Sequence, residues 1–287
     1  MTLLALILVL TAAFVHAIWN FLIKRTGGGP IFLWLFGALA AIIYAPFGVA
    51  AFLFQLPRIR IIEFVFIFGS SILHLVYFIL LSYSYRIADL SLVYPLARGT
   101  GVMLSTVSAI LFLSERPTLI GLVGAILISI SVFVLIIGDP HNFWKSRNRR
   151  GLVCAILTGT AIASYTLWDK YAVSKLLIPP LLMEWSINLF RTAILSAFVV
   201  YRWDDVRTEW RTHRREILGV ALLSPLSYIL ILTALVFSPV SYVAPAREIS
   251  TLIGALMGTR LLAEGDAPRR LVAASIMVLG VIALTLN

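Results

Sequence analysis

The sequence has few of the residues that cover the surface of a soluble protein. Only 13% of its 287 residues are charged, whereas 61% are hydrophobic and the mean hydropathy is +1.00. A chain of this composition cannot keep its apolar surface away from water by folding alone. It also has a single cysteine, Cys154, which excludes an internal disulfide and a paired-cysteine metal motif. The chain is therefore predicted to lie in a membrane.

Motifs for enzymatic chemistry are missing as well. The sequence has no HExxH motif, no Ser-Lys pair at helical spacing, no Cys/His cluster and no ATP-binding loop. We therefore expect no enzyme, no metal and no other cofactor, and any transport would be passive or driven by a gradient. The net charge of +10 lies mostly at the edges of apolar stretches. It indicates membrane topology, and no nucleic-acid partner is expected.

Ten apolar stretches are each long enough to cross a bilayer. A spanning helix needs about 20 apolar residues, because each backbone hydrogen bond must be made inside the segment. The stretches are 2–23, 30–54, 61–82, 88–113, 118–138, 151–174, 180–202, 213–236, 239–262 and 268–286. The first has no Lys or Arg before it, so it is interpreted as a retained span and not as a signal peptide. The predicted fold class is an all-α membrane protein with ten transmembrane helices.

The chain also repeats itself at a shift of 149 residues. This shift pairs Arg98 with Arg247, Glu115 with Glu264 and Trp19 with Trp168. Matching arginines inside apolar stretches are much harder to explain by chance than matching leucines. Each copy has five spans, an odd number, so the second copy must enter the membrane in the opposite sense. Two inverted five-helix repeats around a central cavity are typical of transporters. The predicted domains are 1–140 (first repeat), 141–150 (polar linker) and 151–287 (second repeat).

Arg98 and Arg247 are the leading candidates for substrate binding. Each lies about 12 Å into its span at 1.5 Å per residue. A guanidinium at that depth costs at least about 3 kcal/mol unless it faces a partner or a water-filled cavity. Each arginine could capture a carboxylate or similar anion in a bidentate manner, or it could be tied to a buried acid such as Glu248. Pro95 and Pro245 precede the arginines and are predicted to kink their helices and to serve in gating.

Other polar and aromatic residues are predicted to face the same cavity. The first span has a polar and aromatic stripe, and the sixth span repeats it as Tyr165, Trp168 and Asp169. In the third span, His74 and Tyr77 share one helix face. The remaining predicted substrate-binding residues are His16, Trp19, Asn20, His74, Tyr77, Tyr94, Tyr165 and Trp168. The tryptophans could instead be interfacial, and His74 could be a packing residue. In the seventh span, Glu184, Asn188 and Arg191 follow i, i+4 and i+7 spacing and are predicted to form a structural ion pair.

Several of these motifs resemble one known family. The runs Tyr85–Arg98, Leu111–Thr118, Gly121–Ser131, Phe237–Pro245 and Leu261–Glu264 look like those of the EamA family of the drug/metabolite transporter superfamily. The resemblance implies ten helices in two inverted repeats, a central cavity and alternating-access transport of a small metabolite. Glu115 and Glu264 correspond to the family's Gly-Glu-Arg signature, with Ser114 and Ala263 in place of its glycine. The family name does not supply a substrate.

We therefore predict a secondary transporter of the inner membrane that moves a small anionic or zwitterionic metabolite, such as an amino acid or organic acid. The alternative is a flippase for a phosphate-bearing lipid or lipid-linked metabolite. The expected partners are the solute and the lipid bilayer, a proton is a candidate coupling ion, and both a monomer and a homodimer stay open. Loops on one side of the predicted topology hold fourteen Lys and Arg residues against five on the other. This bias predicts external termini, whereas the family resemblance implies cytoplasmic ones.

Overall fold

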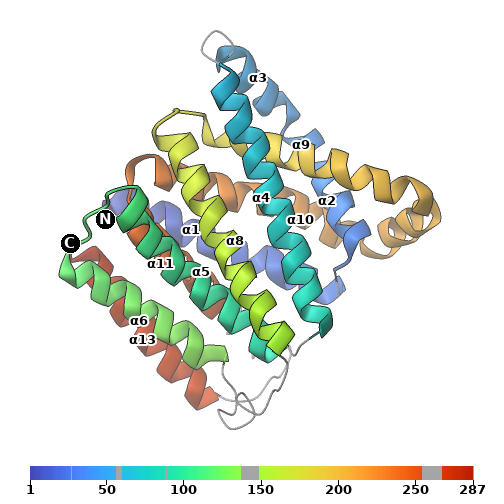
Figure 1. Ribbon diagram of the computed structural model, residues 1–287. Helices are drawn as coiled ribbons and strands as arrows, with labels where there is room; N and C mark the ends of the chain where they lie inside the picture. Colours follow the sequence, from blue (N-terminus) through green and yellow to red (C-terminus); the bar gives the residue numbers. More distant parts are fainter. Residues whose placement is uncertain (27, 56–59, 88–89, 137–148, 254–266, 287) are drawn as a thin grey trace.

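A computed structural model describes residues 1–26, 28–55, 60–87, 90–136, 149–253 and 267–286. Every regular element within these ranges is helical, as the apolar stretches predict (Figure 1). The first half of the chain forms α1 (Leu3–Thr26), α2 (Pro30–Ile43), α3 (Ala45–Gln55), α4 (Ile61–Ile87), α5 (Leu90–Phe112) and α6 (Leu119–Ile136). The second half forms α8 (Arg149–Ser174), α9 (Pro180–Val199), the 3-10 turn η2 (Val200–Arg202), α10 (Trp203–Phe237), α11 (Val240–Arg247) and α13 (Ala267–Thr285).

The second predicted span, 30–54, is bent in its middle. α2 ends at Ile43, α3 begins at Ala45, and the two helix axes differ by 59°. Pro46 explains the break, because proline has no backbone N–H to donate and its ring clashes with the carbonyl four residues back. At the break, the hydroxyl of Tyr44 donates to the carbonyl of Leu222 over 2.7 Å. This hydrogen bond attaches the bend to α10.

Four helical stretches in the described ranges are long and apolar enough to cross a membrane, and the bent α2–α3 pair is a fifth candidate. The four are Leu3–Ile23, Ile61–Leu81, Arg150–Ser174 and Pro180–Phe237. The last has 58 residues and would measure about 87 Å if it were straight, so it must fold back. Figure 1 draws α9 and α10 meeting at the right-hand edge. Shorter apolar helices lie at Leu96–Phe112, Leu119–Val134 and Leu271–Thr285.

Large apolar side chains cover the outer surface of the helices. Leu3, Phe54, Phe112 and Leu119 are each more exposed than buried, and many others like them line α1, α4, α6 and α13. Soluble monomers rarely expose contiguous apolar patches of this extent. The surface therefore suits hydrocarbon, and the chain is an integral membrane protein.

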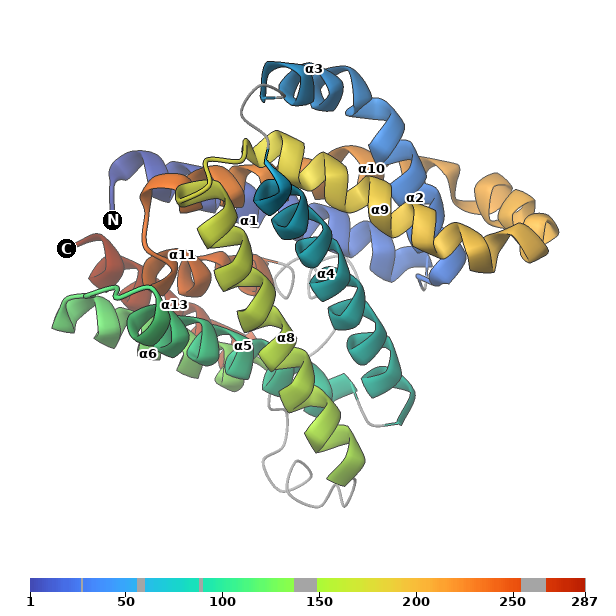
Figure 2. The ribbon, with the colours of Figure 1, turned by 45° about the horizontal axis from the view of Figure 1, so that its top comes forward.

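Helices of the first half pack mainly against helices of the second. α6 lies along α13, α1 lies along α10, and both α4 and α5 pack against α8 (Figures 1 and 2). α2 packs against α9 and α10. Both views place the N- and C-terminal ends near one another. Both halves thus contribute to the main hydrophobic core.

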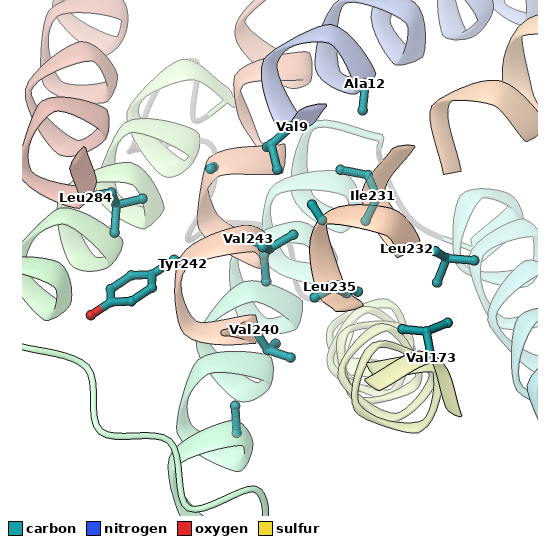
Figure 3. Packing of buried hydrophobic residues seen from close by; sticks show 14 of the residues in the cluster. Val9, Ala12, Val173, Ile231, Leu232, Leu235, Val240, Tyr242, Val243 and Leu284 are labelled. Atoms are coloured by element: carbon teal, nitrogen blue, oxygen red, sulfur yellow. The ribbon is translucent and has the colours of Figure 1, made fainter. Parts of the chain in front are cut away.

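The short helix α11 lies inside that core. All eight of its residues are buried, Pro245 among them. Figure 3 shows Val240 and Val243 of α11 among Val9 of α1, Val173 of α8 and Leu235 of α10. Because the helix is enclosed on all sides, its last residue, Arg247, is held in the interior. The predicted ninth span, 239–262, begins with this helix, and its part from residue 254 lies outside the described residues.

Candidate functional site

Arg98 of α5 is tied to the acid that follows α11. Its Nε donates to Oε2 of Glu248 over 3.0 Å, and its Nη2 lies 2.9 Å from the same oxygen. The hydroxyl of Thr251 joins the pair, because it donates to Glu248 over 3.1 Å and accepts from Arg98 over 3.3 Å. Arg98 is 8% exposed and Glu248 is 1% exposed. The carboxylate next to Arg247 in sequence thus neutralises the other arginine.

Arg247 is buried without such a partner. It is 7% exposed, and its guanidinium makes no hydrogen bond or ion pair with the described residues. The ionisable groups close enough to act on its charge are Tyr165 of α8, Arg98 of α5, Glu248, and Tyr228 of α10. A buried guanidinium whose hydrogen bonds are not made is costly. Arg247 is therefore the strongest candidate for a group that receives its partner from a bound anion.

A second polar group surrounds Asp169 of α8, which is completely buried. Its Oδ1 accepts a hydrogen bond from the hydroxyl of Ser70 over 2.6 Å. Its Oδ2 accepts one from the hydroxyl of Tyr228 over 2.5 Å and lies 3.2 Å from Nε2 of His74. Helices α4, α8 and α10 thus converge on one carboxyl group.

Aromatic rings connect the Asp169 group to its surroundings. The ring of His74 stacks on Tyr165 with centroids 4.2 Å apart, and Tyr77 meets Tyr165 edge-on at 5.7 Å. His16 of α1 lies near enough to Arg98 and Arg247 for their charges to act on it. His16, His74, Tyr77 and Tyr165 are therefore gathered in the same part of the interior as the arginines.

Three other predicted residues make hydrogen bonds outside the group around Arg247 and Asp169. The indole N–H of Trp19 donates to the hydroxyl of Ser227 over 3.2 Å, and that of Trp168 donates to the carbonyl of Phe66 over 2.8 Å. Each tryptophan thus fastens its helix to a helix of the other half. Asn20 is exposed and donates to the carbonyl of His16 on its own helix over 2.9 Å. The side chains of Tyr94 and Pro95 lie outside the described part of the chain.

Two charged side chains hold the ends of the helices that position Arg247. The carboxylate of Glu115 accepts the backbone N–H of Val240 over 2.7 Å and that of Ser241 over 3.0 Å, and the Ser241 hydroxyl donates to it over 2.8 Å. These are the free donors at the start of α11. Lys170 donates to the carbonyls of Leu235 and Ser238 at the end of α10 over 2.6 and 2.9 Å. Glu115 corresponds to the family signature in the sequence, and in the structure it caps the N-terminal end of α11.

The Glu184 group on α9 is a separate buried network. Asn188 donates to Glu184 over 2.6 Å and accepts from Arg191 over 2.6 Å, so an amide stands between the two charges. The guanidinium of Arg191 also lies over the rings of Phe36 and Phe78, at 5.2 and 5.3 Å from their centroids. Glu184 and Arg191 are therefore connected as predicted, but through the amide of Asn188 and not by a direct ion pair.

An apolar groove of about 330 Å³ lies between α5 and α6. Its lining includes Met103, Thr106, Val107, Ile126 and Phe133. None of the residues predicted to bind substrate lines it. No group of three metal-ligating side chains occurs within the described ranges.

Sequence comparison agrees with this architecture. Residues 149–286 match the sequence model of the EamA-like transporter family. This part of the chain, slightly under half of it, belongs to this family. An EamA-like protein is a multi-pass membrane transporter of the drug/metabolite transporter superfamily. The resemblance that the motifs indicated is thus confirmed.

Among the solved structures that resemble this chain is a crystal structure that matches it over nearly its whole length. The TM-score is 0.76, the alignment covers 98% of this chain and 96% of the other, and the sequences are 15% identical. At this identity the likeness shows the fold alone. Among curated proteins, none matches the chain.

Sequence reasoning found the arginines but missed most of the Asp169 group. Asp169, which lies 149 residues after Asn20, was not among the predicted substrate-binding residues, and neither were Ser70 and Tyr228. A usable signal was present, because Ser70 and His74 are four residues apart and share one face of an otherwise apolar helix.

Proposed function

We propose that this EamA-like protein is a secondary transporter of the inner membrane that moves a small anionic or zwitterionic metabolite by alternating access. The observation that carries the proposal is Arg247, a buried guanidinium without a partner among the described residues. Its planar fork matches a carboxylate in a bidentate manner. Amino acids and organic acids are therefore the substrate classes to test.

Arg98 contributes charge and position in this proposal. Two of its nitrogens are engaged by Glu248 and Thr251. It therefore fixes the segment after α11 and keeps a second positive group near Arg247. His16, His74, Tyr77 and Tyr165 line the surroundings of the anion, and Trp19, Asn20, Trp168 and Tyr94 remain predicted contacts at its margin.

The proposal includes ten membrane-spanning helices in two inverted repeats, 1–140 and 151–287, joined by the linker 141–150. The contact between α6 and α13 supports the repeat. A Cβ on Gly124 would lie 2.7 Å from the carbonyl of Gly280, and the hydroxyl of Ser131 donates to the carbonyl of Ala273 over 2.8 Å. At a shift of 149 residues, Gly124 corresponds to Ala273 and Gly280 corresponds to Ser131. Exchanging the two repeats therefore turns the first contact into the second. Such exchange is what a twofold axis between the two helices would produce.

The pattern of helix packing supports the same symmetry. If α1 is equivalent to α8 and α4 to α10, exchanging the repeats turns the α1–α10 contact into the α8–α4 contact, and both occur. The family match to residues 149–286 covers about one unit of the proposed repeat. In this scheme Pro245 and its counterpart Pro95 mark bends at which helices can move during alternating access.

A proteoliposome uptake assay with Arg247→Gln tests the proposed anion site. The assay compares labelled amino acids and organic acids for the wild type, Arg247→Gln, Arg247→Lys and Arg211→Gln, whose arginine is exposed on α10. We expect Arg247→Gln to abolish transport and Arg247→Lys to restore little of it, because lysine lacks the fork. Arg211→Gln should behave like the wild type.

A stability measurement separates binding from folding. Arg247→Gln removes a buried guanidinium that makes no hydrogen bond or ion pair with the described residues, so its thermal stability should equal or exceed that of the wild type. Transport that persists in Arg247→Gln would refute the anion site. Loss of transport together with loss of folded protein would assign Arg247 a structural role.

A lipid flippase is the second candidate, and the groove between α5 and α6 is the observation that favours it. Its apolar lining suits an acyl chain, while the arginines could bind a phosphate head group. A fluorescent phospholipid that changes leaflet in the same liposomes would support the flippase. A transported soluble anion without lipid movement would exclude it.

A further inference from the structure

Asp169 is a buried acid that the proposed anion site does not use. It has no direct contact with an arginine or lysine in the described part of the chain, and its hydrogen-bond partners are Ser70, His74 and Tyr228. Of these, His74 is the imidazole, whose ring nitrogen can donate to the carboxylate or accept from the carboxylic acid according to its tautomer. The pair Asp169–His74 can therefore hold or release one proton without rearranging its neighbours.

The other charged groups near Asp169 are already engaged, with one exception. The titratable and charged groups around it are His74 and Tyr77 on α4, Arg98 on α5, Tyr165 and Lys170 on α8, Glu184 and Arg191 on α9, Tyr228 on α10 and Arg247 on α11. Arg98 pairs with Glu248, Asn188 bridges Glu184 to Arg191, and Lys170 is held by two carbonyls of α10. The exception is Arg247, which is the remaining cation that can balance Asp169.

Charge balance then links the two groups. Without substrate, the positive Arg247 and the negative Asp169 compensate one another at a distance. A bound carboxylate neutralises Arg247 and leaves Asp169 as an excess negative charge in the protein interior. Carrying that charge through the low-dielectric centre of the membrane is costly. A proton taken up by the Asp169–His74 pair returns the loaded site to the charge of the empty one.

We propose that Asp169, with His74 as its hydrogen-bond partner, carries the coupling proton, and that one proton crosses with each monovalent carboxylate. The proposal rests on the proposed transport function. The proton enters from water and binds Asp169 when the anion binds Arg247. Both leave on the other side, and no net charge moves. Transport of a monovalent anion is therefore electroneutral and driven by a pH gradient.

A titration without substrate tests the link between the two residues. Infrared difference spectra of the purified protein in lipid, recorded over a pH series, should contain a carboxylic acid band that Asp169→Asn removes. Arg247→Gln imitates the neutralisation of Arg247 by an anion. In that variant Asp169 should take up its proton at a pH about one unit higher, which is a tenfold change in proton affinity. An unchanged Asp169 band in Arg247→Gln would overturn the linkage.

A flux experiment tests the coupling itself, with lactate and gluconate as monovalent probes. In the wild type, an inward proton gradient should drive their accumulation, and a potassium diffusion potential should not. Asp169→Asn should retain exchange of labelled for unlabelled probe but lose at least tenfold in gradient-driven accumulation. Ser70→Ala, which removes a hydrogen bond but no titratable group, should keep coupling.

The outcomes distinguish this inference from the proposed function. Gradient-driven accumulation in Asp169→Asn, or accumulation of lactate or gluconate in the wild type that ignores pH, would refute proton coupling and leave transport intact. Absence of probe exchange in the wild type would count against carboxylate transport. In that case the infrared titration still decides whether Asp169 and Arg247 are linked.

Discussion

The buried pair Arg98–Glu248 makes a quantitative prediction about stability. Arg98 and Glu248 are 8% and 1% exposed, and their closest atoms are 2.9 Å apart. Removal of one member of such a pair leaves an uncompensated buried charge and typically costs about 3–5 kcal/mol. Replacement of both members by uncharged groups of similar size is often close to neutral. We therefore expect each single substitution to lower the free energy of unfolding more than the double substitution does.

The variants Arg98→Met, Glu248→Gln and their combination form a double-mutant cycle. We expect Arg98→Met to lower the free energy of unfolding by about 3–5 kcal/mol and the double variant to recover at least about 2 kcal/mol of that loss. Reversible unfolding in mixed micelles, followed by tryptophan fluorescence, measures these differences. The exposed pair Arg207–Asp204, with 3.9 Å between its charged atoms, is the matched control and should show no measurable coupling.

Two results would contradict this reasoning. If Arg98→Met is as stable as the wild type, Glu248 is not left uncompensated and the pair is not an isolated buried unit. If the single effects simply add, the two side chains do not stabilise one another. A stable Arg98→Met that fails to transport would instead indicate that Arg98 itself contacts substrate.

Further predictions concern the elements around Arg247 and the placement of the whole chain. Pro245→Ala should slow turnover more than it weakens binding if Pro245 allows α11 to bend during gating; equal effects on rate and affinity, measured in the uptake assay, would argue against this. Glu115→Gln should lower stability by about 1–3 kcal/mol, because an amide cannot accept all the donors at the start of α11, and a thermal shift assay measures the loss. Gly124→Ala should destabilise the protein by about 1–3 kcal/mol through its contact with α13, whereas Gly29→Ala, with open space around it, should not. The charge bias of the loops predicts that a C-terminal reporter active only in the cytoplasm gives no signal.

The helical fold and the family could be predicted from sequence because bilayer physics leaves few alternatives. An apolar stretch of about 20 residues must be helical in hydrocarbon, and the motifs around Arg98 carry the resemblance to the family. The bend at Pro46 was also predictable, since proline in the middle of a helix breaks it. It escaped attention because hydropathy continues unbroken across it.

The details of the site could not be predicted because they depend on how each helix is rotated about its axis. Sequence proximity suggested that Glu248 pairs with Arg247, yet the neighbour of Arg247 along the chain contacts Arg98 across the interface. In the same way, Trp168 was predicted to face the cavity, but its indole N–H donates to the backbone carbonyl of Phe66 on α4. A rotation of one residue, about 100°, changes which helix a side chain meets. The repeat pattern alone does not fix that angle.

The difference between the two arginines follows from one departure from the repeat. The shift of 149 residues places Glu248 opposite Gly99, so an acid follows the second arginine but not the first. A glycine is also what the fold accepts at residue 99, since a Cβ there would lie 2.3 Å from the ring of Phe133. One carboxylate can compensate only one of two buried guanidinium groups, and it compensates Arg98. A perfectly repeated sequence would pair both arginines or neither. This asymmetry leaves Arg247, unlike Arg98, without a carboxylate at ion-pair distance among the described residues.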